Sequence, residues 1–372
     1  MRNAFKNVIV LSFAVLLWII SLLQGTGLGN TVNITNKFHI LLFIILLPII
    51  IVKIKKCRFN IKRNYFYLLI ILLLSFVVVP LLSTKTDGIG YLLVFFICYI
   101  FSLIPLNKQC IKLISLAYGL LGIFFLYIFN YSSILSGWND NSIAMIGFFS
   151  YTIFYIGFMD VQKKYHRIFT LVILVLYLYL LNVTDSRSGM LFVGISLVFI
   201  LNVIKPDNFY EKGKYIYLLF IPLIIVLFVL LISNSSYYEK LNIWSISKFK
   251  KPIFNGRDTI WQYGLEQLKQ HILFGTKTIE NGWHNSAITC LASYGVIGYL
   301  AWIGLFKSIM VRAKGYFKDS YVCASLTAFI FIYLQQSVEL GLIATQPNII
   351  PYVALGIMLG RVRYLKENKR YG

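Results

Sequence analysis

A histidine and an asparagine, His284 and Asn285, stand at the start of an apolar run that continues to residue 306, in a chain with four histidines. Two arginines lie in other short polar segments, Arg187 in TDSRSG and Arg257 in NGRD. Guanidinium groups can bind the oxygens of a diphosphate bidentately, and a histidine can take a proton from a hydroxyl nucleophile. These residue types therefore suit transfer of a glycosyl group from a diphosphate to a sugar hydroxyl.

The two arginines also have structural interpretations. Arg187 is the only basic residue of its short loop and would extend toward the membrane interface or pair with Asp185, two positions earlier. Arg257 would be a solvated loop residue or pair with Asp258 in the first turn of a helix. A charge beside hydrocarbon is costly and is usually kept where it faces water, a partner or a substrate, which favours a functional Arg187.

The remaining polar candidates have structural alternatives as well. We expect His284 to be catalytic and Asn285 to bind substrate beside it; alternatively, His284 would be a satisfied interfacial histidine, and Asn285 would cap the helix that follows it. Glu339, in the segment QQSVELG, is a candidate base or orienting group, with an exposed loop acid as the alternative. No DxD pair and no His/Cys cluster with metal-ligand spacing occurs in the sequence, so we expect no metal and no cofactor.

The composition predicts the elements that must position these residues. The chain has 372 residues, of which 59% are hydrophobic and 13% charged, against about 25% charged residues in a soluble domain. Apolar runs near the ~20 residues that cross a bilayer recur along the whole length and predict one all-α polytopic membrane domain, residues 1–372. We place twelve helices at 8–23, 38–52, 65–82, 89–104, 113–130, 142–159, 168–183, 189–204, 215–233, 285–306, 320–337 and 345–360.

Lysine and arginine concentrate on the side of the membrane that holds both termini. The short loops of the opposite side carry only Lys37, Lys85 and Arg187. The positive-inside rule then makes both termini cytoplasmic and the polar clusters extracytoplasmic. The net charge of +22 is explained by this membrane arrangement, so no nucleic-acid partner is expected.

The longest extracytoplasmic loop, residues 234–284, is too polar to span. Its segment RDTIWQYGLEQLKQHILFG predicts an amphipathic helix that lies flat on the membrane surface or against the bundle. Asn255 or Asp258 is the expected N-cap, and Gly275 the expected stop signal. The apolar stripe consists of Trp261, Leu265, Leu268 and Ile272.

Four segments in this order, GWNDNSIAM, TDSRSGM, NGRDTIW and HNSAITCLASYGVIGYL, resemble the O-antigen ligase / O-antigen polymerase family. The resemblance covers roughly residues 131–306. It implies a class C glycosyltransferase-like architecture and metal-independent transfer of a glycan from undecaprenyl diphosphate. It further implies that Arg187 and Arg257 bind the diphosphate, that His284 is catalytic and that Asn141 lines the site. Asp140 departs from the family, which often has proline there.

The function expected from this resemblance is a bacterial capsule or exopolysaccharide repeat-unit polymerase at the outer face of the cytoplasmic membrane. It would move glycan from undecaprenyl diphosphate to a lipid-linked acceptor repeat, with a chain-length regulator and a flippase as partners implied by the family. An O-antigen ligase that uses lipid A core as acceptor is the alternative within the family. A flippase for lipid-linked oligosaccharide and a structural membrane subunit are alternatives of other classes. A flippase would place charges within its helices, whereas here the loops hold nearly all of them.

Overall fold

The computed structural model describes residues 2–25, 70–83, 89–132, 139–159, 164–184, 186–201, 203–279, 283–344 and 348–371. Helices dominate these residues, and no strand occurs among them. The predicted helix 38–52 lies outside the described residues, as does Asp185. The all-α class is confirmed within the described part of the chain.

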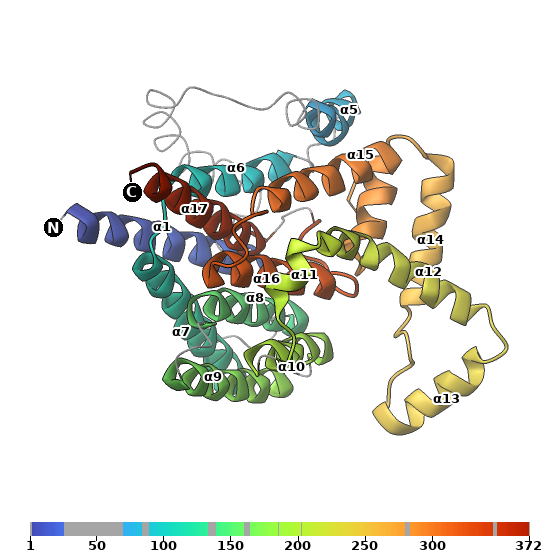
Figure 1. Cartoon of the computed structure of the whole chain (residues 1–372). Helices are drawn as coiled ribbons and strands as arrows, with labels where there is room; N and C mark the ends of the chain where they lie inside the picture. Colours follow the sequence, from blue (N-terminus) through green and yellow to red (C-terminus); the bar gives the residue numbers. More distant parts are fainter. Residues whose placement is uncertain are drawn as a thin grey trace.

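The helices follow one another along the chain in the order shown in Figure 1. The first group is α1 (Arg2–Gly25), a π-helical turn η2 (Leu74–Val78), α5 (Val79–Leu82), α6 (Ile89–Leu103), α7 (Lys108–Tyr131), α8 (Asp140–Phe158), α9 (Lys164–Val183) and α10 (Arg187–Ile200). The second group is α11 (Pro206–Glu211), a 3-10 helix η4 (Lys214–Phe220), α12 (Ile221–Ser233), α13 (Tyr238–Phe249), α14 (Arg257–Gln270), α15 (Ser286–Val311), α16 (Ser320–Gln335) and α17 (Ile350–Tyr371).

Length and composition identify helices that can cross a membrane. Among the described residues, five qualify, namely Lys108–Tyr131, Asp140–Phe158, Lys164–Val183, Lys214–Ser233 and Ser286–Val311. Shorter apolar helices are Asn7–Leu23, Ile70–Leu82, Arg187–Ile200 and Ser320–Gln335. Each predicted span that falls on described residues coincides at least in part with a helix. The chain is thus a multi-pass membrane protein, and the total of twelve spans stays a prediction.

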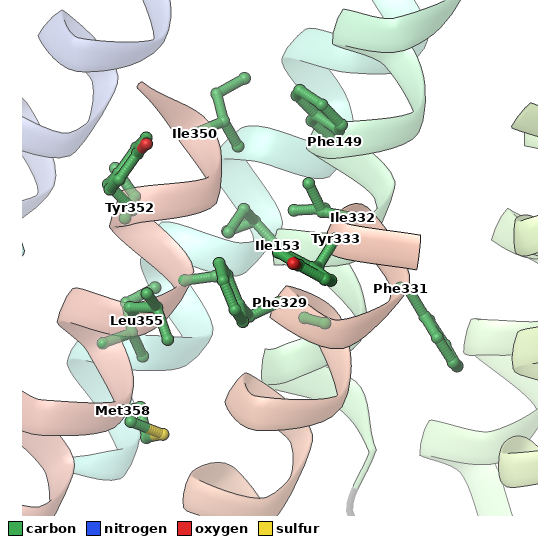
Figure 2. Close-up of a cluster of buried hydrophobic side chains, with 14 of the residues drawn as sticks. Phe149, Ile153, Phe329, Phe331, Ile332, Tyr333, Ile350, Tyr352, Leu355 and Met358 are labelled. Carbon is green, nitrogen blue, oxygen red and sulfur yellow. The ribbon is translucent and has the colours of Figure 1, made fainter. Parts of the chain in front are cut away.

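The centre of the bundle is α8, whose residues from Ile143 to Gly157 are all buried. Figure 2 shows Phe149 and Ile153 of this helix facing side chains of α16 and α17. The aromatic rings of Phe329 and Tyr333 on α16 lie with their centroids 6.0 Å apart. Because other helices surround α8, large apolar side chains are buried on every side of it, and α8 has no polar face.

Helix α15 is broken in its middle at Gly295, which has φ 68° and ψ −173°. In Figure 1 the part before the break runs beside α14, and the part after it runs in another direction. Only glycine adopts such a backbone conformation without steric cost. The apolar run that the sequence presents as one helix is therefore used as two differently oriented parts.

The segment after α14 fills the break in α15. The backbone amides of Thr276 and Lys277 donate to the carbonyls of Ala292 and Ser293 at 2.7 and 2.8 Å. In return, Val296 N donates to the carbonyl of Ile272 at 2.9 Å. These bonds satisfy backbone groups that the break removes from the helix.

Helix α14 lies in the segment predicted as an amphipathic helix and packs against α12 and α15. Trp261 is 1% exposed, and its Nε1 donates to the carbonyl of Trp283 at 2.6 Å. With Val226 of α12 and Ile288 of α15, these two tryptophans belong to one buried apolar cluster. Its contacts with α12 and α15 explain why α14 has one apolar face.

The predicted ends of α14 were wrong. The N-cap is Gly256, which has φ 80° and makes no side-chain capping bond. Asp258 instead accepts a hydrogen bond from Tyr238 Oη at 2.9 Å. The helix ends at Gln270, before Gly275, whose positive φ of 64° lets the chain turn into the break of α15.

Figure 1 also shows how the helix ends are distributed. The start of α1 and the end of α17 lie at one end of the bundle. The start of α14 lies toward the opposite end, with α12 and α13. We call this opposite end the site end, because the candidate residues come together there.

Candidate active site

Polar residues from four segments converge at the site end. Ser188 lies in the first turn of α10, and Arg257 is the first residue of α14. His284 precedes the N-cap of α15, and Glu339 follows the end of α16. Each residue therefore lies at or near a helix terminus.

The Glu339 carboxylate is the meeting point of these segments. Its Oε1 lies 3.3 Å from Arg257 Nη2 and accepts a hydrogen bond from Ser188 Oγ at 3.4 Å. Its Oε2 lies 3.6 Å from His284 Nδ1. The Glu339 side chain is 12% exposed. One half-buried carboxylate thus faces a guanidinium with one oxygen and an imidazole with the other.

His284 presents two different edges. Its Nδ1 is buried, faces Glu339 and has no hydrogen-bond partner among the described residues, because 3.6 Å is longer than a hydrogen bond. The side chain as a whole is nevertheless 38% exposed. The part of the ring that carries Nε2 is therefore the part open to a substrate.

The backbone of His284 has φ 46°, in the left-handed region that residues other than glycine seldom adopt. Such a conformation persists where the surrounding structure holds it in place, and it occurs often at functional sites. The next residue in the chain, Asn285, is itself fixed by hydrogen bonds.

Asn285 has every polar atom of its side chain engaged. Its Oδ1 accepts from the amides of Ala287 and Ile288 at 2.8 and 3.1 Å, which caps α15. Its Nδ2 donates to the carbonyls of Pro222 and Ser337 at 3.0 and 2.7 Å. The residue is 0% exposed. The structure thus gives Asn285 the capping role that was one of its two interpretations.

A second set of bonds reinforces this junction between α15 and the end of α16. Ser286 N donates to the carbonyl of Gln336 at 3.0 Å, and Gln336 Oε1 accepts from Leu342 N at 3.0 Å. Gln336 is 0% exposed. It holds the turn that carries Glu339, and sequence reasoning missed it because a buried glutamine has no local signature.

The electrostatics tie Arg187 to the same place. Burial lowers the pKa of Arg257, the charge of Glu339 raises it, and the charge of Arg187 lowers it again. Arg257 still stays protonated, since an arginine pKa lies so far above neutrality. Arg187 is exposed and makes no ion pair with a described residue. The charges of Arg187 and Arg257 therefore interact, and of these two arginines it is Arg257 that pairs with the Glu339 carboxylate.

Asn141 lies at the start of α8, a different segment from those that meet at Glu339. It is exposed in the first turn of α8, which Asn139 caps by accepting from the amides of Asn141 and Ser142. One turn further on, Met145 Sδ lies 3.8 Å from Gln336 Nε2. Asn141 therefore shares a helix face with a residue that contacts the Glu339 turn, although no contact joins it to Glu339 among the described residues.

Ser188 was also missed, although it is the neighbour of Arg187 in TDSRSG. His284, Arg257 and Glu339 are brought together by contact, and Arg187 by its charge. Among the described residues, no group of three or more His, Cys, Asp or Glu side chains is placed to hold a metal ion.

Comparison with known families adds one finding. Residues 169–303 match the family model described as O-antigen ligase. The match includes Arg187, Arg257 and His284, and it places this part of the chain in the O-antigen ligase/polymerase family, which confirms the resemblance. Glu339 and Asn141 lie outside the matched residues. No match to a curated protein was found.

Proposed function

We propose that this multi-pass membrane protein with an O-antigen ligase domain is a surface-polysaccharide repeat-unit polymerase. It would transfer glycan from undecaprenyl diphosphate to a lipid-linked acceptor repeat at the outer face of the bacterial cytoplasmic membrane. The observation that carries the proposal is the position of Glu339, between an arginine at 3.3 Å and a histidine at 3.6 Å, in a site with an exposed second arginine.

The arginines would bind the donor. Arg257 is half-buried and pairs with the Glu339 carboxylate. A diphosphate carries more negative charge than this carboxylate, so it would replace Glu339 as the partner of the Arg257 guanidinium. Arg187 has no described ion-pair partner and supplies a second guanidinium. In this proposal the two cations neutralise the leaving diphosphate, and Ser188 keeps its hydrogen bond to Glu339.

His284 would activate the acceptor. With Nδ1 directed at Glu339, the proton of the neutral imidazole sits on Nδ1 and the lone pair on the exposed Nε2. The acceptor hydroxyl gives its proton to Nε2 as its oxygen attacks the anomeric carbon of the donor. The bond from that carbon to the diphosphate oxygen breaks, and undecaprenyl diphosphate leaves with the electron pair. Glu339 orients the ring and stabilises the imidazolium that forms.

The family description favours a second candidate, an O-antigen ligase with lipid A core as acceptor. Donor binding and hydroxyl activation would be the same in both enzymes. The two candidates differ in the acceptor, so an experiment that offers either a lipid-linked repeat unit or lipid A core as acceptor distinguishes them.

The test uses purified protein in vesicles with a lipid-linked repeat unit and follows the products by gel electrophoresis. We expect a ladder of carrier-linked glycans that Arg187→Ala, Arg257→Ala and His284→Ala each abolish at equal protein level. Two matched controls keep the ladder: His271→Ala, an exposed histidine after α14, and Arg312→Ala, an exposed arginine after α15.

Three outcomes would contradict the proposal. Normal polymerisation by His284→Ala would exclude its role as base. Product formed only with lipid A core would identify a ligase. Movement of the lipid-linked substrate across the vesicle without a new glycosidic bond would identify a flippase.

A further inference from the structure

Helix α13 (Tyr238–Phe249) extends from the site end of the molecule and lies apart from the main bundle (Figure 1). It follows the spanning segment Lys214–Ser233 after a short turn, and it leads to α14 through residues 250–256. No role in the proposed glycosyl transfer is assigned to it.

Several large apolar side chains on and just before α13 are exposed to the surroundings of the protein. Ile243 is 69% exposed, Trp244 is 51% exposed and Ile246 is 44% exposed, while Tyr237 just before the helix is 68% exposed. A folded protein seldom leaves such a concentration of apolar surface in water without a partner. The opposite side is fixed, because Ser245 is buried and its Oγ donates to the carbonyl of Lys251 at 2.9 Å.

Basic residues accompany these apolar side chains. The segment 238–251 has four lysines and one acidic residue, Glu239, which gives a net charge of four minus one, or +3. The lysines are Lys240, Lys248, Lys250 and Lys251. Because Lys240, Trp244 and Lys248 are spaced by four, they lie along one face of the helix. This combination of tryptophan, isoleucine and lysine matches an anionic membrane surface, where the lysines meet phosphates and the apolar groups enter the acyl boundary.

The connection to α12 sets α13 at the depth of that boundary. Phe228 and Leu231 of α12 are 60% and 73% exposed, as expected for side chains that face lipid in a spanning helix. The chain then reverses within a few residues, since Ser235 N donates to the Ile232 carbonyl at 2.9 Å and Tyr238 N to the Ser235 carbonyl at 3.1 Å. The apolar surface of α12 thus continues almost directly into that of α13.

We propose that α13 is an interfacial helix that lies on the membrane surface at the site end and binds anionic lipid headgroups. Trp244 and Ile243 insert at the boundary between headgroups and acyl chains, and the four lysines contact the lipid phosphates. The helix thereby also keeps the start of α14 close to the membrane. The connection is the hydrogen bond that Tyr238 Oη donates to Asp258 in the first turn of α14. The proposal does not depend on the catalytic assignment.

The experiment measures the depth of Trp244 in the full-length protein reconstituted in vesicles that contain brominated lipids. The quenched fluorescence of Trp244 is the difference between the unmodified protein and Trp244→Phe, which removes the contribution of the five other tryptophans of the six in the chain. We expect strong quenching by bromines near the headgroup, and more of it with phosphatidylglycerol than with phosphatidylcholine alone.

Charge variants test the lipid class. Replacing all four lysines of segment 238–251 by glutamine is expected to abolish the difference between the two lipid compositions, since each lysine near an anionic surface favours the bound state by roughly fivefold. Lys269→Gln, an exposed lysine of α14, is the matched control and leaves the difference intact. Absence of Trp244 quenching in both compositions would overturn the proposal, as would quenching that the four substitutions leave unchanged. Protection of Trp244 only at high protein density would identify a second copy of the chain as the occupant instead.

Discussion

The side-chain amide of Asn285 donates a 2.7 Å hydrogen bond to the carbonyl of Ser337, and this bond joins the start of α15 to the end of α16. His284 directly precedes the donor in sequence, and Glu339 lies two positions after the acceptor. The distance between the histidine and the carboxylate is therefore set by a residue that needs no contact with substrate. Separating this positioning effect from chemistry requires variants at each of the three residues.

Asn285→Ala is expected to destabilise the protein and to misplace His284. It removes a helix cap worth about 1 kcal/mol and leaves buried carbonyls without a donor at about 1–3 kcal/mol, so the total loss is on the order of 3 kcal/mol. Asn285→Ser keeps an acceptor for the cap but loses both donated bonds. Thermal unfolding in detergent would rank Asn285→Ser between the unmodified protein and Asn285→Ala, and equal stability of all three would refute the junction.

Glu339→Gln is expected to reduce kcat more than it changes KM for the lipid-linked donor. The amide cannot stabilise a positively charged His284, while Arg257 becomes freer to bind the diphosphate. We expect His284→Ala to lower the rate by about 10²–10⁴-fold and Glu339→Gln to lower it less. Glu266→Gln, an exposed acid on α14, serves as the control and keeps full activity. A pure increase in KM for Glu339→Gln would contradict the orienting role.

Arg257 and Glu339 are expected to be energetically coupled. Arg257→Ala leaves a carboxylate of 12% exposure without its cation, whereas the double variant Arg257→Ala/Glu339→Ala removes both charges. In a double-mutant cycle on unfolding free energy, we expect a coupling of about 0.5–3 kcal/mol. If the losses of unfolding free energy of the two single variants add up to the loss of the double variant, the 3.3 Å contact does not contribute to stability.

Gly295→Ala is expected to disrupt the break in α15. A Cβ there would lie 2.2 Å from the Leu273 carbonyl oxygen, and the residue would keep a φ of +68°. Gly315→Ala has the same backbone problem at φ +82° but meets nothing within 4 Å, so it isolates the conformational cost of about 1–3 kcal/mol. Gly194→Ala, in a helix with open space around it, should be neutral or slightly stabilising. We expect unfolding temperatures to fall in the order Gly194→Ala, Gly315→Ala, Gly295→Ala, and any other order would refute the clash.

The ion pair between Arg361 and Asp319 is expected to matter for stability and not for glycan transfer. Arg361 is 2% exposed, and its Nη2 lies 2.7 Å from Asp319 Oδ2. Removal of one partner from a buried pair costs about 3–5 kcal/mol. Arg363→Ala breaks a half-exposed pair with Glu367 and is the matched control, worth about 0.3–0.5 kcal/mol. Equal losses of unfolding free energy for Arg361→Ala and Arg363→Ala would contradict this assignment.

The sequence predicted the long apolar helices of the described residues because lipid-facing and core-facing segments both appear as apolar runs, but it did not predict α13, which is too polar to appear as such a run. It also predicted α14, since the spacing of Trp261 and Leu265 gives a helical face that needs cover. The break at Gly295 could not be predicted in this way. Its residues are as apolar as those of an intact span, and the bonds that stabilise it come from Thr276 and Lys277 in a different segment.

In the candidate site, too, the residue types could be predicted from the sequence, whereas their arrangement could not. Arg187, Arg257 and His284 were found from their residue types in polar segments that topology places on one side. Their arrangement around Glu339 depends on contacts between residues far apart in sequence, such as Ser188 with Glu339. The fully bonded amide of Asn285 likewise distinguishes a cap from a ligand only once its neighbours Pro222 and Ser337 are known.

The docking of residues 272–277 in the break of α15 has a consequence for how substrates enter. Helix α14 is attached at its first residue through Arg257 and Glu339, and just beyond its last residue through the backbone bonds to Ala292 and Ser293. The backbone bonds fix the C-terminal end of this 14-residue helix, whereas the contact at its first residue is the one that an incoming diphosphate would replace. Under the proposed function we therefore expect donor and acceptor to reach His284 while the C-terminal end of α14 stays in place, so that cross-linking this end to α15 should leave turnover unchanged.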